Sequence, residues 1–207
     1  MPGTWFIGDL HLGHEKVSDI RGFRTADEHD TAIIRRWQRQ VVEHDTVFVM
    51  GDLSSGSAGS ERRALEILTS LPGSKRLICG NHDSASGIHR RSSPNAALFR
   101  ETFEQVNDFS RIRIDGRTVL LSHYPYASQG DGPGRGELAD ARYLQFRLPD
   151  LGLPLVHAHT HHTDAVSGSR TQRELCVSWD AWRRLVNIGD IHRWLQNIAN
   201  EENEITS

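Results

Sequence analysis

Carboxylate, amide and imidazole side chains recur in this sequence directly after short apolar runs. They occur in five stretches, GDLHLGH (8–14), GDL (51–53), GNHD (80–83), SHYP (122–125) and HAHTHH (157–162). The residues of interest there are Asp9, His11, Asp52, Asn81, His82, Asp83, His123, His159 and His161. Imidazole is the commonest transition-metal ligand among side chains and titrates near neutral pH. A mixed Asp, Asn and His set without thiolates suits Mn, Fe, Ni or Zn, so these motifs favour metal-assisted chemistry with proton transfer.

Turn formation is the alternative explanation for each motif taken singly. Asp and Asn after Gly commonly end strands by bonding to the local backbone, and a single histidine such as His11 or His82 can be a surface or structural residue. Turn chemistry does not explain why histidines share the same strand ends. We therefore favour a functional site for the set as a whole.

The elements that must position these residues can be read from the apolar pattern. Five β-branched-rich runs of strand length, at 4–8, 46–51, 75–80, 117–122 and 153–158, each precede one of the motifs. Helical spacing is found at 30–43, 61–71 and 190–202, with a capping box formed by Thr25 and Glu28 and with Asp190 as an N-cap. Alternating strands and helices indicate an α/β-type arrangement, in which ligands gather at the carboxyl ends of strands. The five motifs should therefore converge on one pocket.

Bulk properties predict one domain covering residues 1–207, with a frayed tail at 200–207. The composition is 37% hydrophobic and 25% charged, and no apolar run approaches the roughly 20 residues of a membrane span. No basic region precedes an apolar stretch at the amino terminus, so we expect a cytoplasmic protein without membrane contact. Cys79 and Cys176 form no CxxC pair and are expected to be small core residues.

The charge balance bears on possible partners. The formal net charge of -3 gives no general reason to expect a long nucleic-acid footprint, because sequence-independent affinity comes mainly from neutralised phosphates. Binding to nucleic acid stays open, since several arginines fall in predicted loops that could reach a polyanion. These are Arg21, Arg24, Arg90, Arg91 and Arg135.

Taken in order, the five motifs resemble the calcineurin-like metallophosphoesterase superfamily, whose pattern is D-x-H, G-D, G-N-H-[DE], H and G-H-x-H. The resemblance spans residues 4–161, and the stretches at 21–37 and 177–191 are similar to a small, uncapped bacterial and phage branch. It implies an α+β fold, a four-layer αββα sandwich of two mixed β-sheets with the site at the carboxyl ends of the strands. Ala158 departs from the family pattern, which usually has glycine there.

The resemblance also implies roles for individual residues. One metal would be held by Asp9, His11 and His161, and the other by Asn81, His123 and His159. Asp52 would bridge the two divalent ions. Mn is the expected metal, and Fe, Ni or Zn stay open. His82 would assist the leaving oxygen, and Asp83 would orient the His82 ring. His14 would contact phosphate, although a helix-start or surface position explains it equally well. His157 and His162 are expected to be solvated or to support the ligands, and His29, His44, His89 and His192 to lie on the surface.

The implied activity is hydrolysis of a phosphoester, a monoester or a diester and nucleotide-like, through attack on phosphorus by a hydroxide shared between two metals. The alternatives within this class are a nuclease and a polynucleotide-end 2′,3′-cyclic phosphodiesterase or phosphatase. Outside it are a non-catalytic scaffold on the same fold and a module that binds a single metal. Every ligand position of the family pattern is filled, which favours the enzyme.

Overall fold

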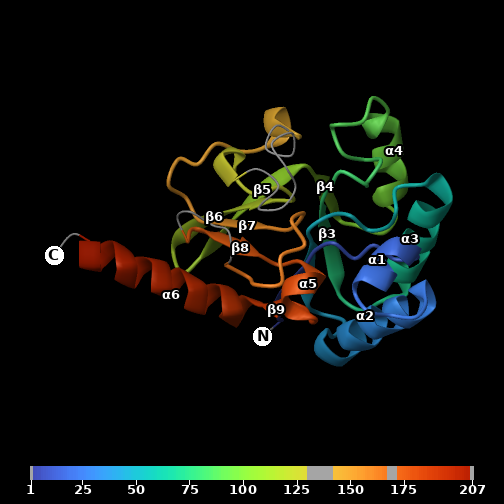
Figure 1. Cartoon of the computed structure of the whole chain (residues 1–207), viewed down its shortest axis with the longest axis horizontal. Coiled ribbons are helices and arrows are strands. Elements are labelled where there is room, and N and C mark those ends of the chain that lie inside the picture. Colours follow the sequence, from blue (N-terminus) through green and yellow to red (C-terminus); the bar gives the residue numbers. More distant parts are fainter. Residues whose placement is uncertain (1, 130–141, 167–171, 206–207) are drawn as a thin grey trace.

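The first β-sheet holds the three strands that precede the motifs GDLHLGH, GDL and GNHD. The computed structural model describes residues 2–129, 142–166 and 172–205, so Arg135 lies outside the described residues. The sheet has the order β4-β3-β2-β1-β9, in which β1 (Thr4–Ile7), β2 (Thr46–Val49), β3 (Ser74–Ile78) and β4 (Gln105–Asn107) are parallel. The short β9 (Val186–Asn187) runs antiparallel to β1 (Figure 1). Because β1, β2 and β3 are parallel neighbours, their carboxyl ends lie at one edge.

The second sheet supplies the other two motifs. Its order is β5-β6-β7-β8, with β5 (Phe109–Ile114) antiparallel to β6 (Arg117–Ser122), and with β7 (Leu155–His157) and β8 (Glu174–Cys176) parallel to β6. Asp115 and Gly116 join β5 to β6 with φ of 49° and 78°, the left-handed values that a tight two-residue hairpin requires. Both sheets are mixed, which confirms the predicted α+β class and its two-sheet sandwich.

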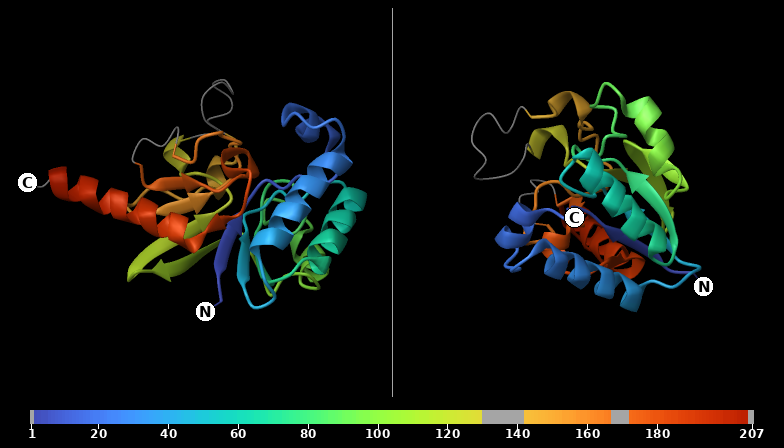
Figure 2. Two further views of the ribbon diagram at one scale, coloured as in Figure 1. Left: turned by 90° about the horizontal axis from the view of Figure 1, so that it is seen from below. Right: turned by 90° about the vertical axis from the view of Figure 1, so that its right-hand side faces the viewer.

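Helices flank the first sheet on one side. These are α1 (Glu15–Ile20), α2 (Ala26–Gln40), α3 (Ala58–Ser70) and α4 (Ser92–Phe99), and Figure 2 shows α1 to α3 on the side of the molecule away from α6. The Thr25 side chain accepts a hydrogen bond from the Glu28 amide, as the capping box predicts. Two 3₁₀ turns, η1 (Ala127–Gln129) and η3 (Leu144–Phe146), follow β6, and the four-residue α5 (Trp179–Trp182) follows β8.

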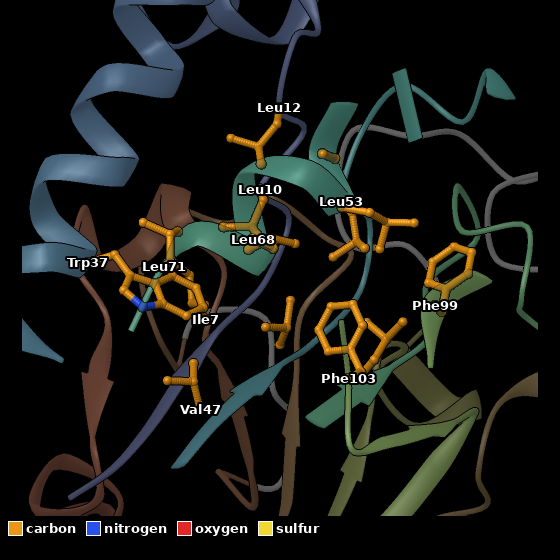
Figure 3. Close-up of a cluster of buried hydrophobic side chains, with 14 of the residues drawn as sticks. Ile7, Leu10, Leu12, Trp37, Val47, Leu53, Leu68, Leu71, Phe99 and Phe103 are labelled. Carbon is orange, nitrogen blue, oxygen red and sulfur yellow. The ribbon is translucent and has the colours of Figure 1, made fainter. Parts of the chain in front are cut away.

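Side-chain alternation along the strands builds two cores. Val47 and Val49 of β2 face a first core with Trp37 of α2 and Leu68 of α3, whereas Phe48 faces a second core between the sheets. Figure 3 shows Trp37 and Leu71 beside Val47 in the first core, with Phe99 and Phe103 at its other side. Cys79 and Cys176 are buried, as expected, and burial raises the pKa of Cys176 to about 12.

The last helix, α6 (Ile188–Ile205), packs along the second core. Ile191, Trp194, Leu195 and Ile198 recur at helical spacing and are buried there. The helix begins two residues before Asp190, and it includes residues 200–205, which the sequence predicted to fray; residues 206 and 207 lie outside the described residues. Among the described residues, no helix combines the length and the apolar character that a membrane span needs.

Candidate metal centre

The five strand ends meet where the two sheets adjoin. Within the first sheet, the amides of Asp9 and His11 donate to the carbonyls of Gly51 and Asp52 at 3.0 and 2.9 Å, so the loops after β1 and β2 continue to pair. Across the sheets, the His159 amide donates to the Asp9 carboxylate at 2.9 Å. The predicted convergence of motifs that are distant in sequence is therefore present in the structure.

One ligand group consists of Asp9, His11 and His161. The ligand atoms of these three residues all lie within 4.8 Å of one another. The Nε2 atoms of His11 and His161 are 3.1 Å apart, and Nε2 of His161 lies 3.9 Å from Oδ1 of Asp9. These three side chains were assigned to one metal from the family pattern, and the fold brings them together.

A second group consists of Asp52, His123 and His159, again with ligand atoms within 4.8 Å of one another. Nδ1 of His159 lies 3.2 Å from Nε2 of His123. The side-chain oxygen of Asn81 lies 3.3 Å from the same Nε2 atom, so the amide predicted as a ligand is part of this cluster.

The Asp52 carboxylate stands between the two groups. Its Oδ2 atom is 3.7 Å from Nε2 of His11, and its Oδ1 atom is 3.6 Å from Nε2 of His123. The residue is 2% exposed. The Asp52 carboxylate thus turns one oxygen toward an imidazole of each group.

Hydrogen bonds at the far side of each ring fix which nitrogen faces the centre. Nδ1 of His123 lies 2.7 Å from the Met50 carbonyl, and Nδ1 of His11 lies 3.2 Å from the Ser54 carbonyl. A carbonyl oxygen only accepts hydrogen bonds, so Nδ1 of each ring is the donor there, and in the neutral form of the ring Nε2 carries the lone pair. Such anchoring of the second ring nitrogen is what metal-binding histidines require.

The spacing and the charges of these side chains suit divalent cations. Two imidazole nitrogens 3.1 Å apart repel each other unless a proton or a cation lies between their lone pairs. Burial lowers the pKa of His11 well below its usual range, and the neighbouring His161 acts in the same direction. Burial also acts to lower the pKa of His161, but the charge of Asp9 and the hydrogen bond to Asp180 outweigh it and raise that pKa. Buried carboxylates around facing imidazoles form a donor set that suits divalent metals.

Backbone strain is concentrated in the same residues. Five of the seven predicted ligands have a left-handed backbone, with φ of 55° at Asp9, 47° at His11, 55° at Asp52, 72° at His159 and 53° at His161. This conformation costs a non-glycine residue about 1 kcal/mol or more and is found mostly where function requires it. The left-handed residues include the alternate members of the D-x-H motif, Asp9 and His11, and of the H-x-H motif, His159 and His161.

Close approach of the loops depends on Gly80. A Cβ atom at Gly80 would lie 2.2 Å from Oδ1 of Asp52 and 2.6 Å from its amide nitrogen. Ala158, in contrast, takes the place of the usual glycine without conflict. Its backbone is not among the positive-φ positions, and its methyl group faces Gly8, which has no Cβ of its own.

Sequence reasoning missed a buried ion pair behind the first ligand group. Arg21 is 7% exposed and donates from Nε and Nη2 to the Asp180 carboxylate at 2.9 and 2.6 Å. It also donates to the backbone carbonyls of Asp9 and Leu10. Asp180 in turn accepts from Nδ1 of His161 at 2.9 Å. The sequence left open that Arg21 reaches a polyanion from a loop; its side chain is instead buried and supports the D-x-H loop from inside.

His29 is a second correction, because it was predicted at the surface and is fully buried. Nη1 of Arg21 donates to Nε2 of His29 at 2.8 Å, and Nδ1 of His29 lies 3.1 Å from the Asp30 carboxylate. Asp30 accepts from the Gly13 amide. The position of His29 on the inner face of α2, in register with Ile33, was the sequence signal that could have revealed its burial.

The structure also corrects the role of Asp83. Its carboxylate accepts from the amides of Asp52, Leu53 and Gly80, at 2.9, 3.0 and 2.7 Å, and therefore ties two ligand loops together. Burial, followed by the charge of Asp52, raises the pKa of Asp83 to about 6. The His82 ring has another partner, since its Nδ1 atom lies 3.2 Å from the Ser55 carbonyl. The predicted pairing of Asp83 with the His82 ring is not present.

The remaining histidines near the site differ in position. His14 is half-buried at the start of α1, and its ring centroid is 5.5 Å from that of His11. His157 is buried, with Nδ1 2.8 Å from the Ala158 carbonyl, and burial lowers its pKa to about 3. Neither His157 nor His162 belongs to the two ligand groups found in the described part of the chain. Tyr124, which follows His123 directly, is buried and packs edge-on against His159.

The fold and this centre agree with the outcome of comparisons with known proteins. The chain belongs to the calcineurin-like phosphoesterase superfamily, because the model of the calcineurin-like phosphoesterase superfamily domain matches residues 7–201. It is 38% identical over 210 residues to the Gene 66 protein of Mycobacterium phage L5, covering 98% of both chains. It is 36% identical over 203 residues to the Gene 66 protein of Mycobacterium phage D29, covering 96% of this chain and 98% of the relative. These matches confirm the predicted resemblance to a small phage-type branch.

A solved structure supports the fold. The crystal structure of protein AQ665 from Aquifex aeolicus superposes with a TM-score of 0.65 at 22% sequence identity, covering 93% of this chain and 99% of that chain. The α+β sandwich is thus shared along the whole length of that protein.

Proposed function

We propose that this protein is a two-metal phosphoester hydrolase. The observation that carries the proposal is the Asp52 carboxylate, whose two oxygens face His11 on one side and His123 on the other at 3.7 and 3.6 Å. A single metal would need one ligand group, whereas the described part of the chain provides two, and Asp52 of the second group also faces His11 of the first. Family membership supplies the reaction class.

The residues that would hold the ions follow from the two groups. Asp9, His11 and His161 would bind one cation; Asn81, His123 and His159 would bind the other; and Asp52 would contact both. When bound, a pair of divalent cations supplies an acidified water as nucleophile and neutralises charge on the phosphoryl oxygens. Manganese is our first choice of metal, and iron, nickel and zinc suit the same nitrogen and oxygen donors.

His82 would serve the leaving group. Its Nδ1 atom is held by the Ser55 carbonyl, which leaves Nε2 directed toward the centre, 4.0 Å from Oδ2 of Asp52. The imidazolium form can therefore donate a proton from Nε2 to the departing oxygen, while Nδ1 keeps the ring in place. Asp83 contributes indirectly, because it fixes the backbone on both sides of Asp52.

A substrate and metal panel tests the proposal. Activated monoesters and diesters, 2′,3′-cyclic nucleotides, dinucleotides and polynucleotides are incubated with Mn, Ni, Zn and Mg in parallel. We expect turnover that requires added metal, and metal content near two equivalents per chain. A stable protein that binds one equivalent, or none, and hydrolyses nothing would contradict it and would favour a single-metal module or a scaffold.

The acid role of His82 has its own test. We expect His82→Ala to retain both metals and to slow turnover by roughly 10²–10⁴-fold on esters with a poor leaving group, the range typical of general acid catalysis. The loss should be much smaller on nitrophenyl esters, whose leaving group needs no proton. Equal losses on both kinds of ester would contradict this role.

A further inference from the structure

A pocket of about 460 Å³ opens beside the candidate metal centre, on the side of its first ligand group. Its inner wall is formed by His11, His161 and His82. Its outer wall comes from α1 and from the residues that follow α5. This outer wall includes His14, Lys16, Val17, Ile20 and Arg183. None of the outer residues has a place in the chemistry proposed above, apart from the predicted phosphate contact of His14.

The outer wall carries positive charge that other lining groups do not cancel. Lys16 and Arg183 are exposed, and in the described part of the chain neither side chain has an ion pair or a hydrogen bond. The other charged lining residues, Arg21 and Asp180, neutralise each other through the ion pair at 2.6 Å. An anion that enters this pocket therefore meets two available cations.

Arg183 also occupies a left-handed backbone position that favours glycine. It is the C-cap of α5 and has a φ of 51°, a left-handed position at which glycine is the usual residue. An arginine that lines a pocket from a strained backbone position is consistent with a functional use of its charge.

Apolar surface lies next to these cations. Val17 is half-buried, and Ile20 is 72% exposed although it lines the pocket. The pocket thus combines cationic groups with an apolar strip along α1. A ligand that matches both features has an anionic group attached to an apolar or planar body, as a nucleotide has.

The position of His82 sets the orientation of such a ligand. His82 lines the pocket and would protonate the leaving oxygen, so the departing half of the substrate extends into this space. We propose that the substrate is a phosphodiester whose leaving group carries a second anionic group, bound by Lys16 and Arg183. This inference rests on the proposed hydrolase function and adds to it the substrate class.

Matched dinucleotides test the preference directly. The substrates are d(TpT) and d(TpTp), which differ only in a 3′-terminal phosphate on the departing thymidine, and the tetranucleotide d(TpTpTpT), which offers an internal phosphate instead. We expect wild-type kcat/KM to be about tenfold or more higher for a substrate with the second charge, and the effect to be mainly in KM. Whether the terminal or the internal phosphate gains more identifies the source of the anion.

Two variants and two controls locate the effect. We expect Lys16→Gln and Arg183→Gln each to reduce the preference several-fold, because kcat/KM falls more for d(TpTp) than for d(TpT). Arg183→Lys should keep most of the preference. Arg62→Gln removes the same charge from the exposed face of α3, outside the pocket, and should keep the full preference. If Arg62→Gln reduces the preference as much as Arg183→Gln does, the preference reflects net charge alone. That result would overturn the assignment of the second anionic group to Lys16 and Arg183.

A binding measurement separates failure of this inference from failure of the proposed function. Thymidine 3′-phosphate is titrated calorimetrically into the protein in EDTA, with thymidine as the uncharged comparison. We expect the phosphate to bind more tightly, and Lys16→Gln with Arg183→Gln to abolish the difference. Hydrolysis of d(TpT) and d(TpTp) at equal kcat/KM, with equal binding of the two probes, would overturn the inference while leaving the hydrolase intact. Absence of any hydrolysis would instead defeat the proposed function.

Discussion

Asp180 shows how a single residue outside the ligand set can control the centre. It accepts a hydrogen bond from Nδ1 of His161 and is itself held by the two-pronged contact of Arg21. A carboxylate in this position orients the imidazole and strengthens it as a ligand through Nε2. Burial disfavours the charged carboxylate, but the bonds from His161 and Arg21 prevail and hold the pKa of Asp180 well below its usual range. The ion pair and the hydrogen bond from His161 therefore favour the ionised form of Asp180.

We predict that Asp180→Asn weakens one metal site selectively. Loss of the charge behind His161 should reduce affinity for the cation of the first ligand group by about 10-fold to 100-fold, the usual effect of removing such a partner. Affinity for the second cation should stay unchanged. Calorimetric titration of the metal-free protein with Mn resolves the two events. Equal weakening of both sites would show that the substitution acts through general unfolding.

Asp190→Asn is the matched control for that experiment. Asp190 is also buried and also bonds to an arginine, with Oδ2 2.7 Å from Nη1 of Arg184, but it lies at the start of α6 outside both ligand groups. Both variants remove one carboxylate charge from an arginine. Only Asp180→Asn should alter metal affinity, whatever the two variants do to thermal stability.

At the scale of elements, the loops after β2 and β3 must approach closely for Asp52 and Asn81 to share a site. A Cβ atom at Gly80 would meet the backbone nitrogen and the carboxylate of Asp52 at 2.6 and 2.2 Å. Backbone cannot rotate away as a flexible side chain can. The loops would have to separate, and this would move the bridging carboxylate.

We predict that Gly80→Ala destabilises the protein by about 2–3 kcal/mol, within the range for forced overpacking, and weakens metal binding as well. Gly59 is the control, because it lies within α3 and a Cβ there would have no atom within 4 Å. Gly59→Ala should stabilise the helix by roughly 0.5–1 kcal/mol and leave metal binding unchanged. Urea unfolding with and without Mn gives both quantities. An unaltered metal affinity in Gly80→Ala would show that loop spacing is not limiting.

Near the site, the sequence predicted the strands well but did not predict which distant side chains pair with one another. The strands that carry Asp9, Asp52 and His123 could be predicted, because an apolar run of strand length ending in a polar residue is a local pattern. The partners of Arg21 could not, because Asp180 is 159 positions away and nothing in either segment marks the pair. The same holds for Asp83, since a carboxylate beside a histidine gives no indication that it will accept from the amides of Asp52 and Leu53 in another loop.

For the whole molecule, the candidate centre joins the two sheets. Asp9 and Asp52 come from the first sheet, whereas His123 and His159 come from the second. Without cations, the strained backbone and the facing imidazoles at this junction act against the packing of the two cores. Metal binding should therefore be coupled to stability of the entire fold rather than to one loop.

We predict that removal of metal lowers the thermal midpoint of unfolding. A cation present at 100 times its dissociation constant adds about 2.7 kcal/mol per site to the free energy of unfolding. Scanning calorimetry of the protein in EDTA and in increasing Mn measures this shift, and the midpoint should keep rising with Mn concentration. Asp52→Asn provides the comparison and should show a much smaller dependence. A midpoint that does not respond to Mn would contradict binding at this junction.

The contact between Gly8 and Ala158 limits how the two sheets can diverge. A Cβ atom at Gly8 would lie 2.5 Å from the methyl group of Ala158, so the seam between β1 and β7 has room for one methyl group and not for two. Each of these positions restricts the other across 150 residues of chain. In descendants of this sequence, a larger residue at position 8 can be accepted only together with a smaller one at position 158, and the two positions should evolve as a pair.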